Sequence, residues 1–97
     1  MAQLIWTESA LVELESIAEF IGRGSAISAK RTVELVYEAA KRIGEHPMSG
    51  RQIPEINNAR HREVFVGAYR LMYRIDEQTL YITAVIHGAR KFNPAEN

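Results

Sequence analysis

The sequence predicts one α+β domain over residues 1–97, in which a short N-terminal strand and an antiparallel helical hairpin pack on an antiparallel β-meander (β-α-α-β-β-β). Apolar residues recur at helical spacing in the first half of the chain, and β-rich segments separated by very short turns fill the second half. With 46% hydrophobic and 25% charged residues, the composition is that of a folded globular protein. A chain of this length accommodates one domain rather than two.

The first two elements are predicted before residue 24. Residues 2–6 are short and apolar, and Thr7 is a good N-cap, so a strand should lead directly into a helix. The helix is predicted from Glu8 to about Arg23, because apolar side chains recur at spacings of three and four, at Leu11, Leu14, Ile17, Ala18 and Ile21.

A second helix is predicted up to about Glu45. Gly22 and Gly24 can adopt the positive φ that ends helices, and either Ser25 or Ser28 can cap the helix that follows. Its apolar side chains are Ala29, Val33, Val36, Ala40 and Ile43. Since only a short loop joins the two helices, they should form an antiparallel hairpin.

The second half of the chain predicts a loop and three strands. Residues 47–60 contain two prolines and have no sustained periodicity, which indicates an ordered connecting loop. The predicted strands cover residues 62–66, 69–75 and 80–87, separated by Gly67-Ala68 and by residues 76–79. Turns this short favour consecutive hairpins and therefore an antiparallel meander.

Strand alternation assigns side chains to the two faces of the predicted sheet. The simplest model places six side chains under the helices: Leu71, Tyr73, Ile75, Ile82, Ala84 and Ile86. It leaves Arg70, Arg74 and His87 on the open face.

Several classes of function are disfavoured by composition. The chain has no cysteine, which excludes disulfides and thiolate chemistry, and His46, His61 and His87 are too scattered to suggest a metal site. No metal or other cofactor is therefore expected. There is no signal-peptide pattern and no apolar run of membrane-spanning length, so we expect a cytoplasmic protein without membrane contacts. A formal net charge of zero and a pI near 6.8 make direct binding to nucleic acid less favoured.

The neutral total conceals an uneven distribution of charge. Residues 1–50 hold five basic and seven acidic side chains, whereas residues 51–97 hold seven basic and five acidic ones. Arginines dominate the second half, and their planar guanidinium groups suit carboxylate or phosphate partners. The candidate partner-binding residues are Arg51, Arg62, Arg70, Arg74, His87 and Arg90. The alternative is that these arginines form solvated cross-strand pairs with glutamates.

The order of these elements and motifs resembles the RelE/ParE superfamily of bacterial type II toxins, and the ParE branch most closely. The motifs are Gly50-Arg51-x-x-Pro54-Glu55, Arg62-Glu63, Tyr69-Arg70-x-x-Tyr73-Arg74-Ile75 and His87-Gly88-Ala89-Arg90. The resemblance implies a small toxin encoded with a cognate antitoxin, whose flexible segment folds over the toxin and neutralises it in a hetero-oligomer.

Two activities divide that superfamily. ParE-like members bind and inhibit DNA gyrase without chemistry of their own, whereas RelE-like and YoeB-like members cleave mRNA on the ribosome. The resemblance offers Glu55, Arg70 and His87 as base, charge-stabilising cation and acid for RNA cleavage. However, the tyrosine that follows the histidine in YoeB-like enzymes is replaced by Gly88. A neutral chain also gains little affinity for ribosomal RNA. We therefore expect a gyrase inhibitor that is not an enzyme, with the ribosome-dependent nuclease as the alternative.

Two further features remain open at the level of sequence. His87 can serve catalysis, or it can simply hold the C-terminal segment by hydrogen bonding. A helical hairpin on a small sheet can also leave an apolar groove or an unpaired strand edge for the antitoxin. The candidate groove residues, which could equally belong to the core, are Leu11, Leu14, Val36 and Tyr37. The arginine-rich face would attract an acidic antitoxin segment.

Overall fold

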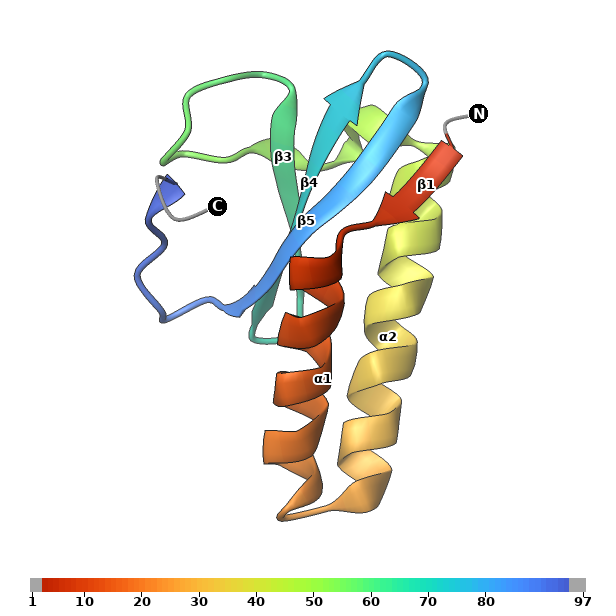
Figure 1. The fold of residues 1–97 in the computed structure, drawn as a ribbon, viewed down its shortest axis with the longest axis vertical. Helices are drawn as coiled ribbons and strands as arrows, with labels where there is room; N and C mark the ends of the chain where they lie inside the picture. The colour runs from red at the N-terminus through yellow and green to blue at the C-terminus, as the bar shows by residue number, and fades with distance from the viewer. Residues whose placement is uncertain (1–2, 95–97) are drawn as a thin grey trace.

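The computed structural model describes residues 3–94 and contains two helices and a five-stranded sheet (Figure 1). The elements, in chain order, are β1 (Gln3–Trp6), α1 (Glu8–Gly22), α2 (Ala26–Glu45), the 3₁₀ turn η1 (Pro47–Ser49), β2 (Arg51–Gln52), β3 (His61–Val66), β4 (Tyr69–Asp76) and β5 (Thr79–His87). The predicted α+β class and element order are confirmed. Ala2 of the predicted first strand lies outside the described residues. The predicted connecting loop contains η1 and the two-residue strand β2.

The strand order across the sheet is β1-β5-β4-β3-β2. The pairs β2–β3, β3–β4 and β4–β5 are antiparallel, and β3 to β5 form the predicted meander. Strand β1 lies parallel to β5, with Leu4 opposite Leu80 and Trp6 opposite Ile82. The first and last strands are therefore neighbours (Figure 1), and the last strand becomes internal along the residues that β1 covers.

Helix α1 begins at its predicted cap, Thr7, and α2 begins at Ser25, one of its two candidate caps. The Thr7 hydroxyl accepts a hydrogen bond from the Ala10 N–H at 3.3 Å and donates one to the Ile82 carbonyl at 2.8 Å. The Ser25 hydroxyl accepts the Ser28 N–H at 3.1 Å, so Ser25 is the cap of α2. Thr7 thus joins the start of α1 to the neighbouring strand β5.

The first helix ends near the predicted position, but the prediction that a glycine with a positive φ ends it is wrong. Helix α1 is followed by Arg23 with a right-handed φ of −62°, and neither Gly22 nor Gly24 has a positive φ. Among the described glycines, only Gly67 has one, at 58°, in the β3–β4 turn. Helix α1 therefore ends without a left-handed glycine, and the Arg23 N–H donates to carbonyls of the last turn, including Glu19 O at 3.3 Å.

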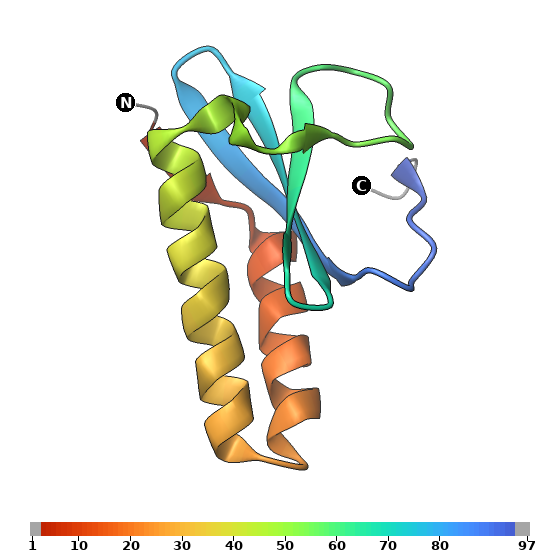
Figure 2. The same cartoon turned by 180° about the vertical axis from the view of Figure 1, so that it is seen from behind.

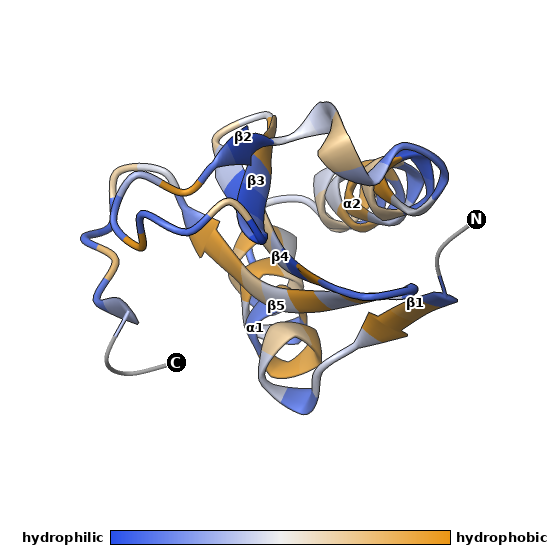
Figure 3. Cartoon of the chain, turned by 90° about the horizontal axis from the view of Figure 1, so that it is seen from above, coloured by the Kyte–Doolittle hydropathy of each residue, from blue (hydrophilic) through white to orange (hydrophobic). Residues whose placement is uncertain are grey.

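The main core lies between the helical hairpin and one face of the sheet (Figure 2). Its buried residues are Ala10, Leu14, Val36, Ala39, Ala40, Ile43, Leu71, Tyr73, Leu80, Ile82 and Val85. Hydrophobic colour runs along β1 and much of β5, whereas β2 and the start of β3 are hydrophilic (Figure 3). Neither described helix has the length and apolarity needed to cross a membrane.

An irregularity in the β4–β5 pairing changes which side chains of β5 face the helices. Met72 pairs with Ala84 but Tyr73 pairs with Ile82, which leaves Thr83 as an extra residue on β5. A one-residue bulge reverses the alternation beyond it. The placement of Ala84 and Ile86 under the helices is therefore wrong. Val85 takes that position, while Leu71, Tyr73, Ile75 and Ile82 lie on the predicted face.

Ala84 and Ile86 instead belong to a second, smaller cluster on the opposite face of the sheet. Its buried residues are Ile53, Met72, Ala84, Ile86 and Phe92, with Ile56 packed against them. The loop after β2 and the C-terminal segment supply the covering residues, and both lie on the side of the sheet away from the hairpin (Figure 2). We use the term open face for this side.

Candidate functional site

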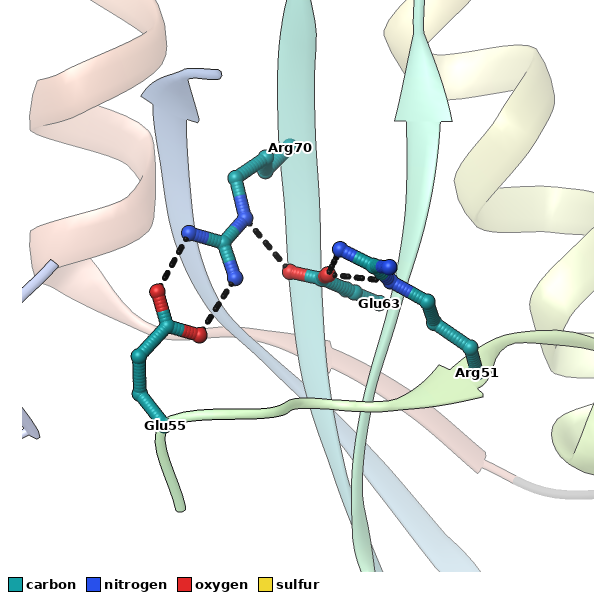
Figure 4. A network of polar contacts seen from close by, with 4 residues as sticks. All are labelled: Arg51, Glu55, Glu63 and Arg70. Carbon is teal, nitrogen blue, oxygen red and sulfur yellow. Dashed lines mark hydrogen bonds and ion pairs between the residues drawn. The ribbon is translucent and has the colours of Figure 1, made fainter. Parts of the chain in front are cut away.

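Arg70 is the centre of a polar network on the open face (Figure 4). It projects from β4 and is only 5% exposed. Its Nη1 and Nη2 donate to the two carboxylate oxygens of Glu55 at 2.9 and 2.8 Å. Its Nε donates to Glu63 Oε1 at 2.6 Å. The guanidinium group is therefore held on two sides, with the bidentate geometry that makes arginine–carboxylate pairs strong.

Glu63 extends the network to a second arginine. It lies on β3 at 1% exposure, and its Oε2 accepts from Arg51 Nε at 2.7 Å and Nη2 at 2.6 Å. The chain of contacts runs Glu55–Arg70–Glu63–Arg51, with two acids and two bases (Figure 4). Buried charges require this degree of pairing, because an unpaired one costs several kcal/mol.

Electrostatics keeps the network charged. Hydrogen bonds from Arg70 lower the pKa of Glu55, and this effect outweighs the desolvation that opposes it. Hydrogen bonds to the carboxylates of Glu55 and Glu63 raise the pKa of Arg70 above its already high ordinary value. A carboxylate with a lowered pKa is a weaker base than an ordinary one, so the pairing works against Glu55 as a general base.

The Gly50-Arg51-x-x-Pro54-Glu55 motif holds the loop against the sheet. The Gly50 N–H donates to the Tyr73 hydroxyl at 2.9 Å, and that hydroxyl donates to the Pro47 carbonyl at 2.7 Å. Arg62 donates from Nη1 to the Gly50 carbonyl and from Nε to the Ala59 carbonyl, both at 2.9 Å. Arg62 is therefore engaged with backbone carbonyls.

His87 does not join Glu55 and Arg70. It lies opposite Tyr69 in the β4–β5 register, and the two rings meet edge to face with centroids 5.4 Å apart. Tyr69 packs against the helix-side core, whereas Arg70, its neighbour on β4, points to the other face. The prediction that His87 lies on the open face is therefore wrong, because the bulge at Thr83 reverses the orientation of the end of β5. His87 Nδ1 accepts the Ala89 N–H at 3.0 Å, as the structural alternative for this residue requires.

The remaining predicted arginines fall in two places. Arg74 lies on the open face, with its guanidinium carbon 4.6 Å from the centroid of the Tyr81 ring. Arg90 follows β5 and lines a groove beside α1 together with His87. The structure thus brings Arg51 and Arg70 together, uses Arg62 in a loop contact, and separates Arg74 from His87 and Arg90.

The groove beside α1 has a volume of about 400 Å³ and is mainly apolar. Val12, Ile17 and Phe20 line it from α1, and Val12 and Phe20 are among the exposed large hydrophobic residues. Within it, the Glu13 carboxylate accepts the Val85 N–H at 3.0 Å, and burial raises the pKa of Glu13. Val12 and Phe20 lie off the apolar seam of α1, and that signal could have located the groove from the sequence.

Three of the four candidate groove residues, Leu11, Leu14 and Tyr37, line a smaller groove of about 310 Å³ between the two helices. Leu11 and Tyr37 line it and are 41% and 46% exposed. Leu14 also lines it but is buried, and Val36 is a fully buried core residue. Two of the four candidate residues are therefore exposed for contact. Within residues 3–94, no group of three or more His, Asp or Glu side chains is placed to hold a metal ion.

Comparison with known proteins identifies the family. A family model described as "ParE toxin of type II toxin-antitoxin system, parDE" matches residues 4–92. The chain belongs to the ParE toxin family. This ParE-family member is 34% identical over 91 residues to Toxin RelE2 of Caulobacter vibrioides (strain ATCC 19089 / CIP 103742 / CB 15). The alignment covers 93% of this chain and 99% of that protein. The resemblance to the ParE branch is confirmed.

The ParE fold is also found in a solved structure described as a chromosomal ParDE TA system from P. aeruginosa. The match has a TM-score of 0.74 at 18% identity and covers 90% of this chain and 96% of that one. As a ParE-family member, the chain is a toxin of a ParDE-type type II toxin-antitoxin system.

Proposed function

We propose that this toxin inhibits DNA gyrase by protein–protein contact and is neutralised by a cognate antitoxin in a hetero-oligomer. Membership of the ParE family supports the proposal. The single observation that carries it is the separation of Glu55 and Arg70 from His87 by the sheet. Without convergence of these groups, the nuclease alternative lacks its catalytic geometry.

The chemistry of RNA cleavage explains why this separation supports the proposal. Attack of a 2′-hydroxyl on the adjacent phosphate needs a base, an acid for the leaving oxygen and a cation for the developing charge, all within hydrogen-bond reach of the reacting atoms. Arg70 already donates to Glu55 and Glu63 through Nε, Nη1 and Nη2. A phosphate would have to break a bidentate ion pair to reach it.

Two assays run in parallel test the target. The purified toxin is added to a gyrase supercoiling reaction and to a coupled translation reaction followed by primer extension on the mRNA. We expect loss of supercoiling with no new mRNA ends, and addition of the purified antitoxin should restore supercoiling. New ends that depend on ribosomes, together with unaffected supercoiling, would replace gyrase inhibition by the nuclease alternative.

For the antitoxin, we propose that an amphipathic segment covers the exposed apolar side chains of α1. The α1 groove offers Val12 and Phe20, and the groove between the helices offers Leu11 and Tyr37. The similarity to a structure described as a ParDE TA system supports the existence of an antitoxin partner. Such grooves suit a helix whose apolar residues recur at i, i+3, i+4 and i+7.

Co-purification tests this surface. Val12→Asp and Phe20→Asp should each reduce capture of the antitoxin encoded by the adjoining reading frame at least tenfold, because a charge is then buried in the interface. The matched control is Glu19→Gln, a change at an exposed polar residue of the same helix. Full capture by both Asp variants would place the antitoxin elsewhere.

A further inference from the structure

One arginine of the open face has no carboxylate partner among the described residues. Arg51 and Arg70 are neutralised by Glu63 and Glu55, whereas Arg74 forms no ion pair within residues 3–94. It packs on the ring of Tyr81. A guanidinium on an aromatic face keeps its N–H donors available around its edge.

Arg74 lines a pocket of about 300 Å³ between the sheet, the loop after β2 and the C-terminal segment. The apolar side chains of Ile53, Ile56 and Phe92 line the same pocket, and so does His61. The pocket therefore combines an apolar wall with a cation that has no carboxylate partner within residues 3–94.

Two arginines, Arg74 and Arg60, act on the ring of His61. Burial, Arg74 and Arg60 all lower the pKa of His61, in that order. Arg60 is itself paired with Asp76 at 3.3 Å. An imidazole with a lowered pKa is neutral at pH 7 and offers one N–H donor beside Arg74 without adding charge.

We propose that this pocket binds one carboxylate side chain of a partner protein, an Asp or Glu flanked by an apolar residue. The guanidinium fork of Arg74 matches a carboxylate, and Ile53, Ile56 and Phe92 accommodate the apolar neighbour. RNA is the less suitable ligand, because a polyanion gains affinity from several free cations and the nearby Arg51 and Arg70 are already neutralised. The proposal is independent of whether gyrase is the target.

NMR titration of the full chain tests the pocket. The probe is the peptide acetyl-Ala-Leu-Glu-Leu-Ala-amide, and its Gln counterpart has the same shape without the charge. We expect saturable shifts of the Arg74 Nε–H and His61 ring signals with a Kd of roughly 1 mM, as suits a single contact. The Gln peptide should bind at least fivefold more weakly.

Variants separate a specific pocket from general attraction. Arg74→Gln should abolish the shifts, and Arg74→Lys should bind with intermediate affinity because it keeps the charge but loses the fork. Arg60→Gln is the matched control and should bind as the wild type does, since Arg60 is paired with Asp76. The amide spectrum of each variant reports whether it is folded.

Four results would each overturn the proposal. They are equal binding of the Glu and Gln peptides, unchanged binding by folded Arg74→Gln, absence of saturation up to roughly 20 mM peptide, and stronger shifts of Arg74 by a short oligouridylate than by the Glu peptide. The last result would identify an RNA surface instead.

Discussion

At the scale of single residues, Gly50 and Arg70 decide how the open face is built. Gly50 approaches the sheet so closely that a Cβ added there would lie 2.5 Å from the Tyr73 hydroxyl and 2.7 Å from the Glu63 carbonyl. Arg70, almost fully buried, joins the loop residue Glu55 to the strand residue Glu63. Gly50 thus fastens the segment before β2 to the sheet, and Arg70 fastens the loop after β2.

Gly50→Ala should therefore be strongly destabilising. The methyl group must displace the Tyr73 hydroxyl, which loses its buried hydrogen bond to the Gly50 N–H. We expect the free energy of unfolding to fall by about 2–4 kcal/mol in urea denaturation. Gly24→Ala is the control, because the nearest atom to its added Cβ is 3.7 Å away and its φ is not positive. Similar stabilities for the two variants would contradict the close approach.

The ion pair of Glu55 predicts a specific acid sensitivity. Because Arg70 depresses the pKa of Glu55 in the folded state, the pair stabilises the fold above the unfolded pKa of about 4.3. That contribution is lost as the pH falls through the lower folded pKa. The unfolding free energy of Glu55→Gln should accordingly fall less steeply than that of the wild type below about pH 4.3.

Chemical denaturation at a series of pH values measures this difference. Glu38→Gln changes an exposed α2 carboxylate outside the network and should follow the wild-type pH profile. Parallel profiles for Glu55→Gln and the wild type would show that Arg70 does not depress the Glu55 pKa.

At the scale of elements, the tight turns and the bulge set the geometry of the sheet. The two-residue connections at Gly67-Ala68 and Glu77-Gln78 place β3, β4 and β5 side by side. The bulge at Thr83 then gives β5 two apolar faces, one for each core. A regular β5 would have presented Ile82, Ala84 and Ile86 to the helices together.

The β4–β5 turn contains a correctable source of strain. Glu77 has a φ of 57°, in the left-handed region that non-glycine residues rarely adopt. Glu77→Gly should raise the free energy of unfolding by about 0.5–1 kcal/mol, because glycine adopts this φ without steric cost. Thermal unfolding checks it, with Gln78→Gly as a control that should lower stability. A loss of stability in Glu77→Gly would mean that the left-handed φ is not strained.

At the scale of the whole molecule, helices cover one face of the sheet and irregular segments cover part of the other. The helical hairpin covers one face with the larger core, while the loop after β2 and the C-terminal segment cover part of the other (Figures 1 and 2). Phe92 is the residue of the C-terminal segment buried in the smaller cluster. The two coverings should therefore differ in local stability.

Phe92→Ala should loosen the covering of the open face without unfolding the helical side. The lost contacts are those with Ile53, Met72, Ala84 and Ile86, so we expect amide exchange to accelerate about tenfold or more in residues 53–58 and 88–94. Exchange in α1, α2 and their side of the core should be unchanged. Hydrogen exchange with mass spectrometry tests this, and uniform acceleration would indicate a single cooperative unit.

Local signals were sufficient to predict much of the fold. The helical spacing of apolar residues, the caps Thr7 and Ser25 and the two tight turns all depend on neighbours within a few positions, and each is confirmed. The candidate site was only partly predictable. Glu55 and Arg70 lie together, as the nuclease alternative requires. The bulge at Thr83 could not be predicted, because one extra residue within a strand leaves no recognisable pattern in the sequence.

The α+β class, the element order and the neutral total charge follow from the amino-acid sequence alone, since propensity, capping and composition are local or additive properties. The parallel pairing of β1 with β5 and the position of His87 beside α1 emerge only in the folded chain. So does the pairing of Arg51 and Arg70 with carboxylates, a pairing that Arg74 lacks within residues 3–94. These outcomes depend on register and on which charges lie within a few ångströms of one another. The balanced charges of the sequence become, in three dimensions, a paired series of four side chains, with Arg74 near it and without a carboxylate partner among the described residues.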